Sequence, residues 1–250
     1  MKNVIYMVAI DHPTSQFRVS DYSGPAIKSW QAWCKKHNVD FYLNDTHDES
    51  FGRPIWNKEK VFELIGDKYD KIGIVDADTM PRWDMPNIFE MYDDELCGVV
   101  DNDNLGYLVN SIHHYKKFFP DTEMDIYSYI NAGVIFCTNK HKELFDYLLN
   151  FYYINKEEID NWSIPNTGRE QTIFNFAIEK LSIKKKLLPP IWNLVGMVKK
   201  DMFQHNWTLN DKTQYFMKYG LLWHFTGFPI ESRIQIMNQI WDNLKDNWLK

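Results

Sequence analysis

Short, uninterrupted apolar runs alternate along the chain with longer segments whose apolar residues recur every three or four positions. The short runs are typical of strands buried on both faces, and the spaced pattern is typical of helices with one buried face. The expected strands lie at residues 3–10, 39–43, 71–77, 96–100, 129–138 and 220–225, and the expected helices at 24–37, 57–69, 141–154, 169–181 and 231–248. This order predicts one α/β domain over residues 1–250, with a largely parallel central sheet flanked by helices and the last helix docked on the core.

The third expected strand ends in two carboxylates one residue apart, Asp76 and Asp78, and residues 79–81 then break away from it. Ligands of open α/β sheets bind at the carboxyl ends of strands, and the two-residue period of a strand directs both side chains to the same side. Two carboxylates this close repel each other unless a cation or a proton lies between them. Oxygen ligands suit Mn²⁺ or Mg²⁺, so the pair indicates a metal ion that holds a diphosphate.

A second pair of carboxylates, Asp101 and Asp103, follows the fourth expected strand. The residues beyond it, 104–111, show no signal comparable to the break that follows the first pair. We therefore assign the metal to Asp76 and Asp78, and we expect Asp101 to line the site.

Charge and apolar-run length limit the classes of function. The net charge is −6, so the chain as a whole offers no basic surface, and nucleic acid is not an expected partner. A basic run at residues 184–186 is interpreted as a solvated turn. Residues 1–10 are interpreted as a strand and not as a signal peptide. No apolar run approaches the ~20 residues of a membrane span, so no transmembrane segment is expected.

The three cysteines, Cys34, Cys97 and Cys137, are scattered and show no metal-ligand spacing. This pattern predicts neither a zinc site nor a disulfide framework, and it favours a reducing compartment. The high share of Asn, Lys, Ile and Tyr is typical of a low-GC genome. We therefore expect a cytoplasmic protein of a bacterium, or of a virus in the cytosol of its host.

Four short segments follow one another along the chain: IVDADT (74–79), YINAGVIFCTN (129–139), GREQTIFN (168–175) and LLWHFTG (221–227). They resemble, in the same order, motifs of glycosyltransferase family 8, the glycogenin and lipopolysaccharide galactosyltransferase group, which has the GT-A fold. The chain resembles this family over roughly residues 3–230. The resemblance implies a metal-dependent enzyme that moves a hexose from a nucleotide-diphosphate sugar, UDP in the family's usual case, to a hydroxyl of a glycan, lipid or protein acceptor, with retention of anomeric configuration.

The resemblance also implies which residues bind the metal ion. Asp76, Asp78 and His224 would hold Mn²⁺ or Mg²⁺, and an imidazole nitrogen is a reasonable third ligand for Mn²⁺. Without the resemblance, the alternative for His224 is a core histidine that packs beside Trp223.

The catalytic residues implied by the resemblance are Asn131, Glu170 and Gln171. Asn131 would contact the donor sugar or the acceptor, with Ala132 and Gly133 allowing a close approach of the backbone. Glu170 and Gln171 would line the sugar site near the anomeric carbon. The alternatives are an asparagine that bonds to nearby backbone and an ordinary exposed helix start. The family more often has aspartate where this chain has Glu170.

The donor nucleotide would be bound by residues scattered along the chain. The candidates are Asp11, Tyr22, Lys58 or Lys60, Ala77, Gly227 and Arg233. The family has one lysine or arginine that reaches the donor from the helix before the carboxylate pair. The alternative for either lysine here is a solvated side chain on the face of a helix. The chain lacks the family's lysine two residues beyond the glycine at 227, and Arg233 is the expected substitute because a guanidinium suits phosphate.

Two other classes of function remain open from the sequence. A phosphatase of the haloacid dehalogenase type also has an apolar strand followed by two aspartates, and Asp76 would then be its nucleophile. A non-catalytic protein that binds nucleotide sugars or glycans is the other alternative, since the expected diphosphate lysine is missing.

Overall fold

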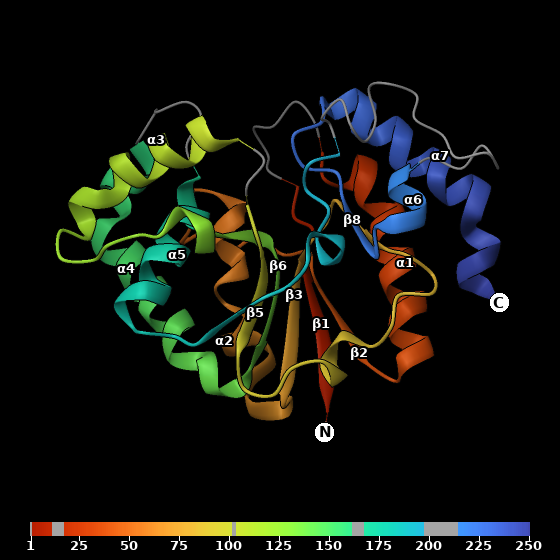
Figure 1. Ribbon diagram of the computed structural model, residues 1–250, viewed down its shortest axis with the longest axis horizontal. Helices are drawn as coiled ribbons and strands as arrows, with labels where there is room; N and C mark the ends of the chain where they lie inside the picture. The colour runs from red at the N-terminus through yellow and green to blue at the C-terminus, as the bar shows by residue number, and fades with distance from the viewer. Residues whose placement is uncertain (1, 12–17, 102–103, 162–167, 198–214) are drawn as a thin grey trace.

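A twisted sheet of six strands forms the centre of the computed structural model, which describes residues 2–11, 18–101, 104–161, 168–197 and 215–250 (Figure 1). The strands of this sheet are β1 (Asn3–Val8), β2 (Asp40–Asn44), β3 (Lys71–Asp76), β5 (Leu96–Val100), β6 (Ile130–Thr138) and β7 (Lys185–Leu187). Their order is β2-β1-β3-β6-β5-β7, and β6 runs antiparallel to both of its neighbours while the other pairs are parallel. The predicted α/β class with a mostly parallel sheet is confirmed.

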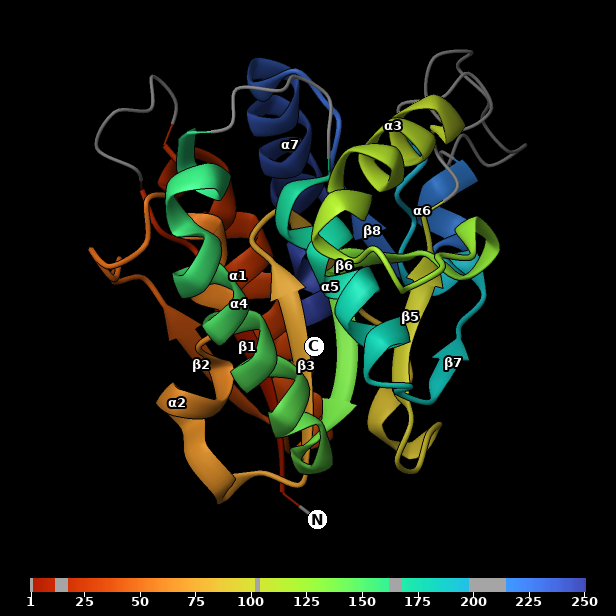
Figure 2. The ribbon, with the colours of Figure 1, turned by 90° about the vertical axis from the view of Figure 1, so that its left-hand side faces the viewer.

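Helices cover both faces of the sheet. They are α1 (Ser20–His37), α2 (Val61–Ile65), α3 (Leu105–Tyr115), α4 (Lys142–Asn161), α5 (Arg169–Lys180), α6 (Tyr215–Tyr219) and α7 (Ile230–Leu249). Single 3₁₀ turns connect them: η1 (Pro54–Lys58), η2 (Gly66–Lys68), η3 (Ile88–Glu90), η4 (Lys116–Phe118), η5 (Ile126–Ser128), η6 (Asn139–His141) and η7 (Pro190–Trp192). Figures 1 and 2 show α2, α4 and α5 on one side of the sheet and α1 and α7 on the other.

Alternate residues of the central strands pack into two separate cores. Ile5, Met7 and Val75 join the core beneath α1 and α7. Tyr6 and Ile74, their neighbours in the strands, join the core beneath α4 and α5. Because both faces are covered, these strands are apolar throughout, and this is why they are recognisable in the sequence.

A second, two-stranded sheet joins distant parts of the chain. β4 (Thr79–Pro81) and β8 (Leu222–His224) pair antiparallel, with Thr79 opposite His224. The hydrogen bond from the Phe225 N–H to the Asp78 carbonyl (2.9 Å) continues this pairing. The chain does leave β3 at the predicted break, but residues 79–81 form a strand there, which places the C-terminal histidine beside the carboxylate pair.

Three expectations of local structure are corrected. The basic run at 184–186 is not a solvated turn, because most of it belongs to the edge strand β7, where Lys185 contacts Ser128 and Glu179. The helix expected at 57–69 is divided into η1, α2 and η2, and Gly66 ends α2 with a positive φ of 59°. The segment after Asp101, which showed no signal, contains α3, and the Asn104 side chain caps its first turn by accepting from the Tyr107 N–H.

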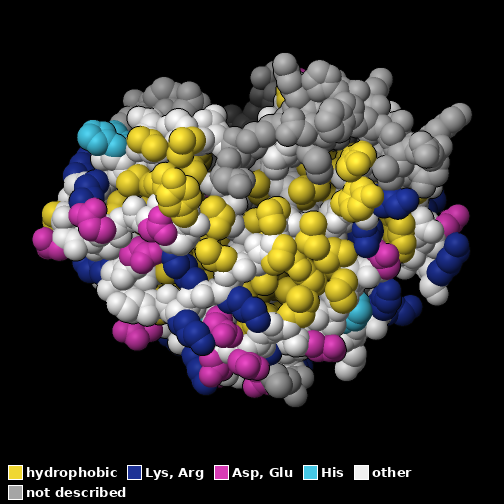
Figure 3. All heavy atoms as spheres, viewed as in Figure 1, with side chains coloured by type: hydrophobic (Ala, Val, Ile, Leu, Met, Phe, Trp, Pro, Cys, Tyr) yellow, Lys and Arg dark blue, Asp and Glu magenta, His cyan; other side chains and the backbone are white. Residues whose placement is uncertain are grey.

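The surface drawn in Figure 3 carries both signs of charge. Basic and acidic side chains alternate around its lower edge and flanks, and hydrophobic side chains gather near its middle. This face, where it is described, presents no extended basic patch. Cys34, Cys97 and Cys137 are buried and unpaired. None of the helices in the described ranges is long and apolar enough to cross a membrane.

Candidate metal centre

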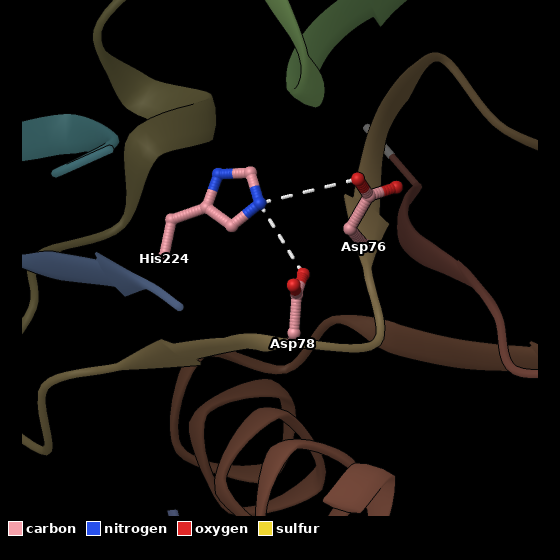
Figure 4. A group of neighbouring side chains, drawn as sticks. All are labelled: Asp76, Asp78 and His224. Carbon is pink, nitrogen blue, oxygen red and sulfur yellow. Dashed lines mark ion pairs between the residues drawn. The ribbon is translucent and has the colours of Figure 1, made fainter. Parts of the chain in front are cut away.

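Asp76, Asp78 and His224 meet at the carboxyl end of β3. Asp76 is the last residue of β3, Asp78 follows in the turn, and His224 is the last residue of β8. One ligand atom from each lies within 4.8 Å of the others. His224 Nε2 is 3.2 Å from Asp78 Oδ1 and 4.0 Å from Asp76 Oδ2, and Figure 4 shows this ring nitrogen directed at both carboxylates.

The unpartnered nitrogen of His224 is the strongest sign that the group fits a cation. Nε2 is buried and makes no hydrogen bond within the described part of the chain. A buried polar atom without a hydrogen bond is costly, and one that faces two carboxylates calls for a proton or a cation between them. Two carboxylate oxygens and one imidazole nitrogen are a donor set that binds Mn²⁺ and related divalent cations. The predicted trio is therefore assembled and fits the metal.

Gly133 permits the close approach of His224 and Asp76 to strand β6. A Cβ at this position would lie 2.3 Å from His224 Cε1 and 2.7 Å from Asp76 Oδ2. No side chain is compatible with those distances, so glycine is required where β6 passes the site. The sequence analysis expected the backbone at Gly133 to approach the donor sugar or the acceptor. In the structure, the side chains that lie close to this backbone are His224 and Asp76.

Lys58, and not Lys60, lies in the site. Its ammonium is 2.9 Å from Asp76 Oδ1 and 3.3 Å from Glu170 Oε1, and it donates to the Ala132 carbonyl at 3.2 Å. Burial alone would lower the pKa of Lys58, but the two carboxylates outweigh it and raise the pKa above its ordinary value. Lys60 instead pairs with Asp48.

The charge of Glu170 is tied to this lysine. Burial raises the pKa of Glu170, Lys58 opposes that shift, and nearby Asp76 adds to it.

The pKa of Asp78 is shifted in the opposite direction, below its ordinary value. Burial by itself would raise the pKa of Asp78, but His224 and the Arg233 guanidinium outweigh it and hold the pKa of this carboxyl below its ordinary value.

Asn131 has all of its hydrogen-bonding capacity engaged inside the protein. Its amide nitrogen donates to Asp101 Oδ2 (3.1 Å) and Gln171 Oε1 (3.2 Å). Its oxygen accepts from the Gly133 N–H and from Asn193 Nδ2, each at 3.0 Å. An asparagine side chain has two donor hydrogens and two acceptor positions, so none is left over in this arrangement.

Gln171 is held in the same network. Its Oε1 also accepts from the Ala132 N–H at 2.9 Å, and its Nε2 donates to Asp101 Oδ2 at 3.0 Å. Asp101 therefore lies beside the candidate catalytic residues, where the sequence placed it. Residues 102–103, the rest of the second carboxylate pair, lie outside the described residues.

Asn193 is a site residue that the sequence did not reveal. It is fully buried and its Oδ1 lies 2.9 Å from His224 Nδ1. No motif surrounds it, and it belongs to no regular helix or strand. Its place follows from the bridge between Leu194 and Trp223, which aligns it with β8, and this pairing has no local signature in the sequence.

A cavity of about 270 Å³ opens beside the carboxylates. Its lining includes the expected donor-binding residues Tyr22, Lys58, Ala77 and Arg233, together with Val8, Ile10, Val19, Pro54, Ile55, Asp76 and Asp78. Arg233 Nη1 lies 3.1 Å from Asp78 Oδ2, and Arg233 Cζ lies 5.2 Å from the centre of the Tyr22 ring. The buried Nε of Arg233 has no hydrogen-bond partner among the described residues. An apolar cavity with a charged end suits a nucleotide.

Besides Lys60, two expected donor-binding residues are not among those that line this cavity. Asp11 is exposed and accepts hydrogen bonds from the backbone and hydroxyl of Ser20, at the start of α1. Gly227 occupies the turn before α7 with a positive φ of 76°. Residues 12–17, which belong to the segment expected to receive the base and ribose, lie outside the described residues.

Solved structures of several glycosyltransferases share this architecture at low sequence identity. A glycosyltransferase involved in the glycosylation of the major capsid of PBCV-1 superposes with a TM-score of 0.59 at 11% identity, over 96% of this chain and 100% of that one. The galactosyltransferase LgtC, in complex with donor and acceptor sugar analogs, gives a TM-score of 0.52 at 14% identity, over 98% and 99%.

The apo WbbM bifunctional glycosyltransferase gives a TM-score of 0.57 at 14% identity, over 100% of this chain and 52% of that one. Neither a protein-family model nor a curated protein matches the sequence. The structural likeness establishes the architecture, and the chain has the GT-A fold of glycosyltransferases.

Proposed function

We propose that this protein is a metal-dependent glycosyltransferase that uses a nucleotide-diphosphate sugar. The observation that carries the proposal is the buried, unpartnered Nε2 of His224, directed at Asp76 and Asp78 beside a cavity of about 270 Å³. The GT-A fold supports it, since the sites of α/β sheets lie at the carboxyl ends of strands. The same fold favours the transferase over the phosphatase alternative.

The metal ligands in this proposal are Asp76, Asp78 and His224, and the ion is Mn²⁺ or Mg²⁺. A divalent cation held by them would stabilise the negative charge that develops on a leaving diphosphate. Arg233 supplies a second positive charge, because its guanidinium borders the cavity and its Nε is unpartnered. It would take the place of the lysine that the resemblance expects beyond Gly227.

The sugar is proposed to lie near Lys58 and Glu170, with Asn131 and Gln171 behind it. In the reaction, the bond between the anomeric carbon and the phosphate oxygen breaks, and its electron pair leaves with the diphosphate. The acceptor hydroxyl attacks the same face, and its proton passes to the departing phosphate oxygen. This front-face route with retention is favoured because Glu170 is paired with Lys58 and Gln171 is fully hydrogen-bonded, so neither is poised as a covalent nucleophile.

The proposed donor is a UDP-hexose, and the acceptor is a hydroxyl of a glycan, lipid or protein. Tyr22 and the apolar lining of the cavity offer a surface for a base and a ribose. The UDP assignment itself rests on the resemblance of the sequence to family 8.

The test is release of nucleotide from a panel of UDP-, GDP- and ADP-sugars, with Mn²⁺, with Mg²⁺ and with a chelator. Cation-dependent turnover of one donor class is expected. Asp78→Asn and His224→Gln should each reduce turnover at least about a hundredfold, since they remove a ligand of the cation. The matched control is Asp94→Asn, which removes an exposed carboxylate paired with Lys140 and should leave turnover unchanged.

Equal turnover with cation and with chelator would contradict the metal dependence. Binding of a nucleotide sugar without hydrolysis or transfer to any of a panel of acceptors would favour the non-catalytic alternative. The anomeric configuration of a product, measured by the proton coupling at the anomeric carbon, decides between retention and inversion.

A further inference from the structure

His224 is held from behind by a row of buried polar side chains. Its Nδ1 lies 2.9 Å from Asn193 Oδ1. Asn193 Nδ2 donates to Asn131 Oδ1 at 3.0 Å, and Asn131 Nδ2 donates to Asp101 Oδ2 at 3.1 Å. The exposed fractions of Asn193, His224, Asn131 and Asp101 are 0%, 2%, 6% and 8%, so water does not compete for these bonds.

The direction of each bond is set by groups that cannot reverse their roles. Asp101 Oδ2 accepts from Gln171 Nε2 as well as from Asn131, so it faces the amide nitrogen of Asn131. The backbone N–H of Gly133 only donates, and it contacts the oxygen of the same side chain at 3.0 Å. These two anchors fix the orientation of Asn131 independently of each other.

The orientation of Asn131 then passes to the histidine. Since Asn131 presents its oxygen to Asn193, Asn193 must donate with its amide nitrogen. The amide oxygen of Asn193 is therefore directed at His224. An amide oxygen only accepts, so the proton of this hydrogen bond must be on Nδ1 of His224. The other nitrogen, Nε2, is the one directed at the two carboxylates.

We propose that Asn131 and Asn193 are positioning residues that hold the His224 ring with its Nδ1–H on Asn193 Oδ1, so that Nε2 is the nitrogen presented to the cation site. This inference rests on the proposed function, because the orientation of His224 matters only if the ring binds the cation. Metal-bound histidines usually donate their second N–H to a fixed acceptor, which orients the ring and selects the tautomer. Here the acceptor is an amide whose own direction is set by a carboxylate and a backbone N–H.

The direct test is the tautomer of His224 in the metal-free wild-type protein. Long-range proton–nitrogen correlation spectra of histidine-labelled protein, recorded at about pH 9 where histidine is ordinarily neutral, distinguish the two ring nitrogens. Since the chain has eight histidines, the His224 signals are assigned by their absence from a His224→Gln spectrum. We expect Nδ1 to carry a proton whether or not Nε2 does, and an unprotonated Nδ1 would overturn the proposal.

A variant tests whether Asn193 keeps the proton of His224 on Nδ1. Asn193→Leu has a similar volume and removes the acceptor of Nδ1, so His224 is expected to populate the Nε2–H tautomer, which is the major one in water. The dissociation constant for Mn²⁺, measured by paramagnetic resonance, should rise about tenfold to a hundredfold. An unchanged tautomer with an unchanged dissociation constant, in a folded variant, would overturn the role of Asn193.

The matched control is Asn44→Leu. Asn44 is also a buried asparagine, and its amide donates to the Tyr6 hydroxyl at 2.9 Å, outside the row that reaches His224. It should lose stability while keeping the tautomer and the Mn²⁺ dissociation constant of the wild type. If Asn193→Leu does not fold, the wild-type spectrum still decides the proposal.

The two proposals fail in different ways. A wild-type protein that binds no divalent cation would refute the proposed function. The tautomer is measured without any cation, so it tests Asn131 and Asn193 separately.

Discussion

Lys58 shows how single buried charges organise this site. Its ammonium contacts Asp76, Glu170 and a backbone carbonyl of β6, so one side chain ties together three segments. A buried ion pair contributes little net stability when it is intact, but removal of one partner leaves a charge that is buried without compensation. Lys58 is thus needed to compensate the negative charge of Asp76 and Glu170.

Replacement of this lysine should therefore be costly. Lys58→Met keeps most of the side-chain volume and is expected to lower the free energy of unfolding by about 3 kcal/mol, measured by urea denaturation with a chelator present. Lys60→Met is the matched control, and it should cost less than about 1 kcal/mol because Lys60 forms its pairs nearer the surface. Equal losses in the two variants would show that Lys58 is an ordinary surface lysine.

Glu59, next to Lys58 in the sequence, gives a prediction about pH. Burial raises the pKa of Glu59 to about 8, although Lys58 opposes the shift, and its Oε2 has no hydrogen-bond partner among the described residues. In the unfolded chain the same carboxyl ionises near 4.5. Between these two values the native state binds more protons, so the free energy of unfolding should fall as the pH rises from about 5 to about 8.

Glu59→Gln removes this source of pH dependence. The variant should gain stability relative to the wild type as the pH rises through the same window, with little gain at its acid end. Urea denaturation of both proteins at several pH values from about 5 to 8 measures the difference. A difference that stays constant across the window would contradict the raised pKa.

At the scale of elements, α7 supports the candidate metal site from a distance. It packs against α1, and Trp248 near its end donates to the Pro81 carbonyl of β4 at 2.9 Å. The Trp248 ring also contacts Trp83, Trp223 and Trp241. Since β4 pairs with β8, which carries His224, this tryptophan helps to hold the two-stranded sheet in place.

Loss of Trp248 should therefore affect both stability and the cation. Trp248→Ala is expected to lower the free energy of unfolding by about 3–5 kcal/mol and to raise the Mn²⁺ dissociation constant. Trp248→Phe keeps an aromatic ring and loses the hydrogen bond, so its effects should be smaller, with about 1 kcal/mol from the missing bond. A Trp248→Ala variant that is destabilised but binds Mn²⁺ like the wild type would show that α7 does not support the site.

The predictability of elements follows their burial. β1, β3 and β6 are recognisable because both faces are covered, but an apolar run is the same in either direction, so the antiparallel course of β6 could not be foreseen. β4 and β7 are three residues each, too short to show a pattern. The candidate ligands could be named because the two aspartates form one local motif and the resemblance pointed to His224, whereas the place of Asn193 depends on a bridge between distant segments.

At the scale of the whole molecule, the site joins two segments that lie far apart in the sequence. β3 delivers Asp76 and leads directly to Asp78, while β8, far along the sequence, delivers His224 through its pairing with β4. The likeness to known GT-A structures, at identities of 11–14%, shows that this arrangement of elements persists when few residues are shared. Function must still be argued from the site itself.

The most direct test of the account is anomalous X-ray diffraction at the manganese edge from crystals grown with Mn²⁺ and UDP. We predict an anomalous peak within ligand distance of Asp76, Asp78 and His224, and no such peak at this place in crystals of Asp78→Asn. Manganese bound elsewhere, or density for the nucleotide with these three side chains uninvolved, would contradict the central claim.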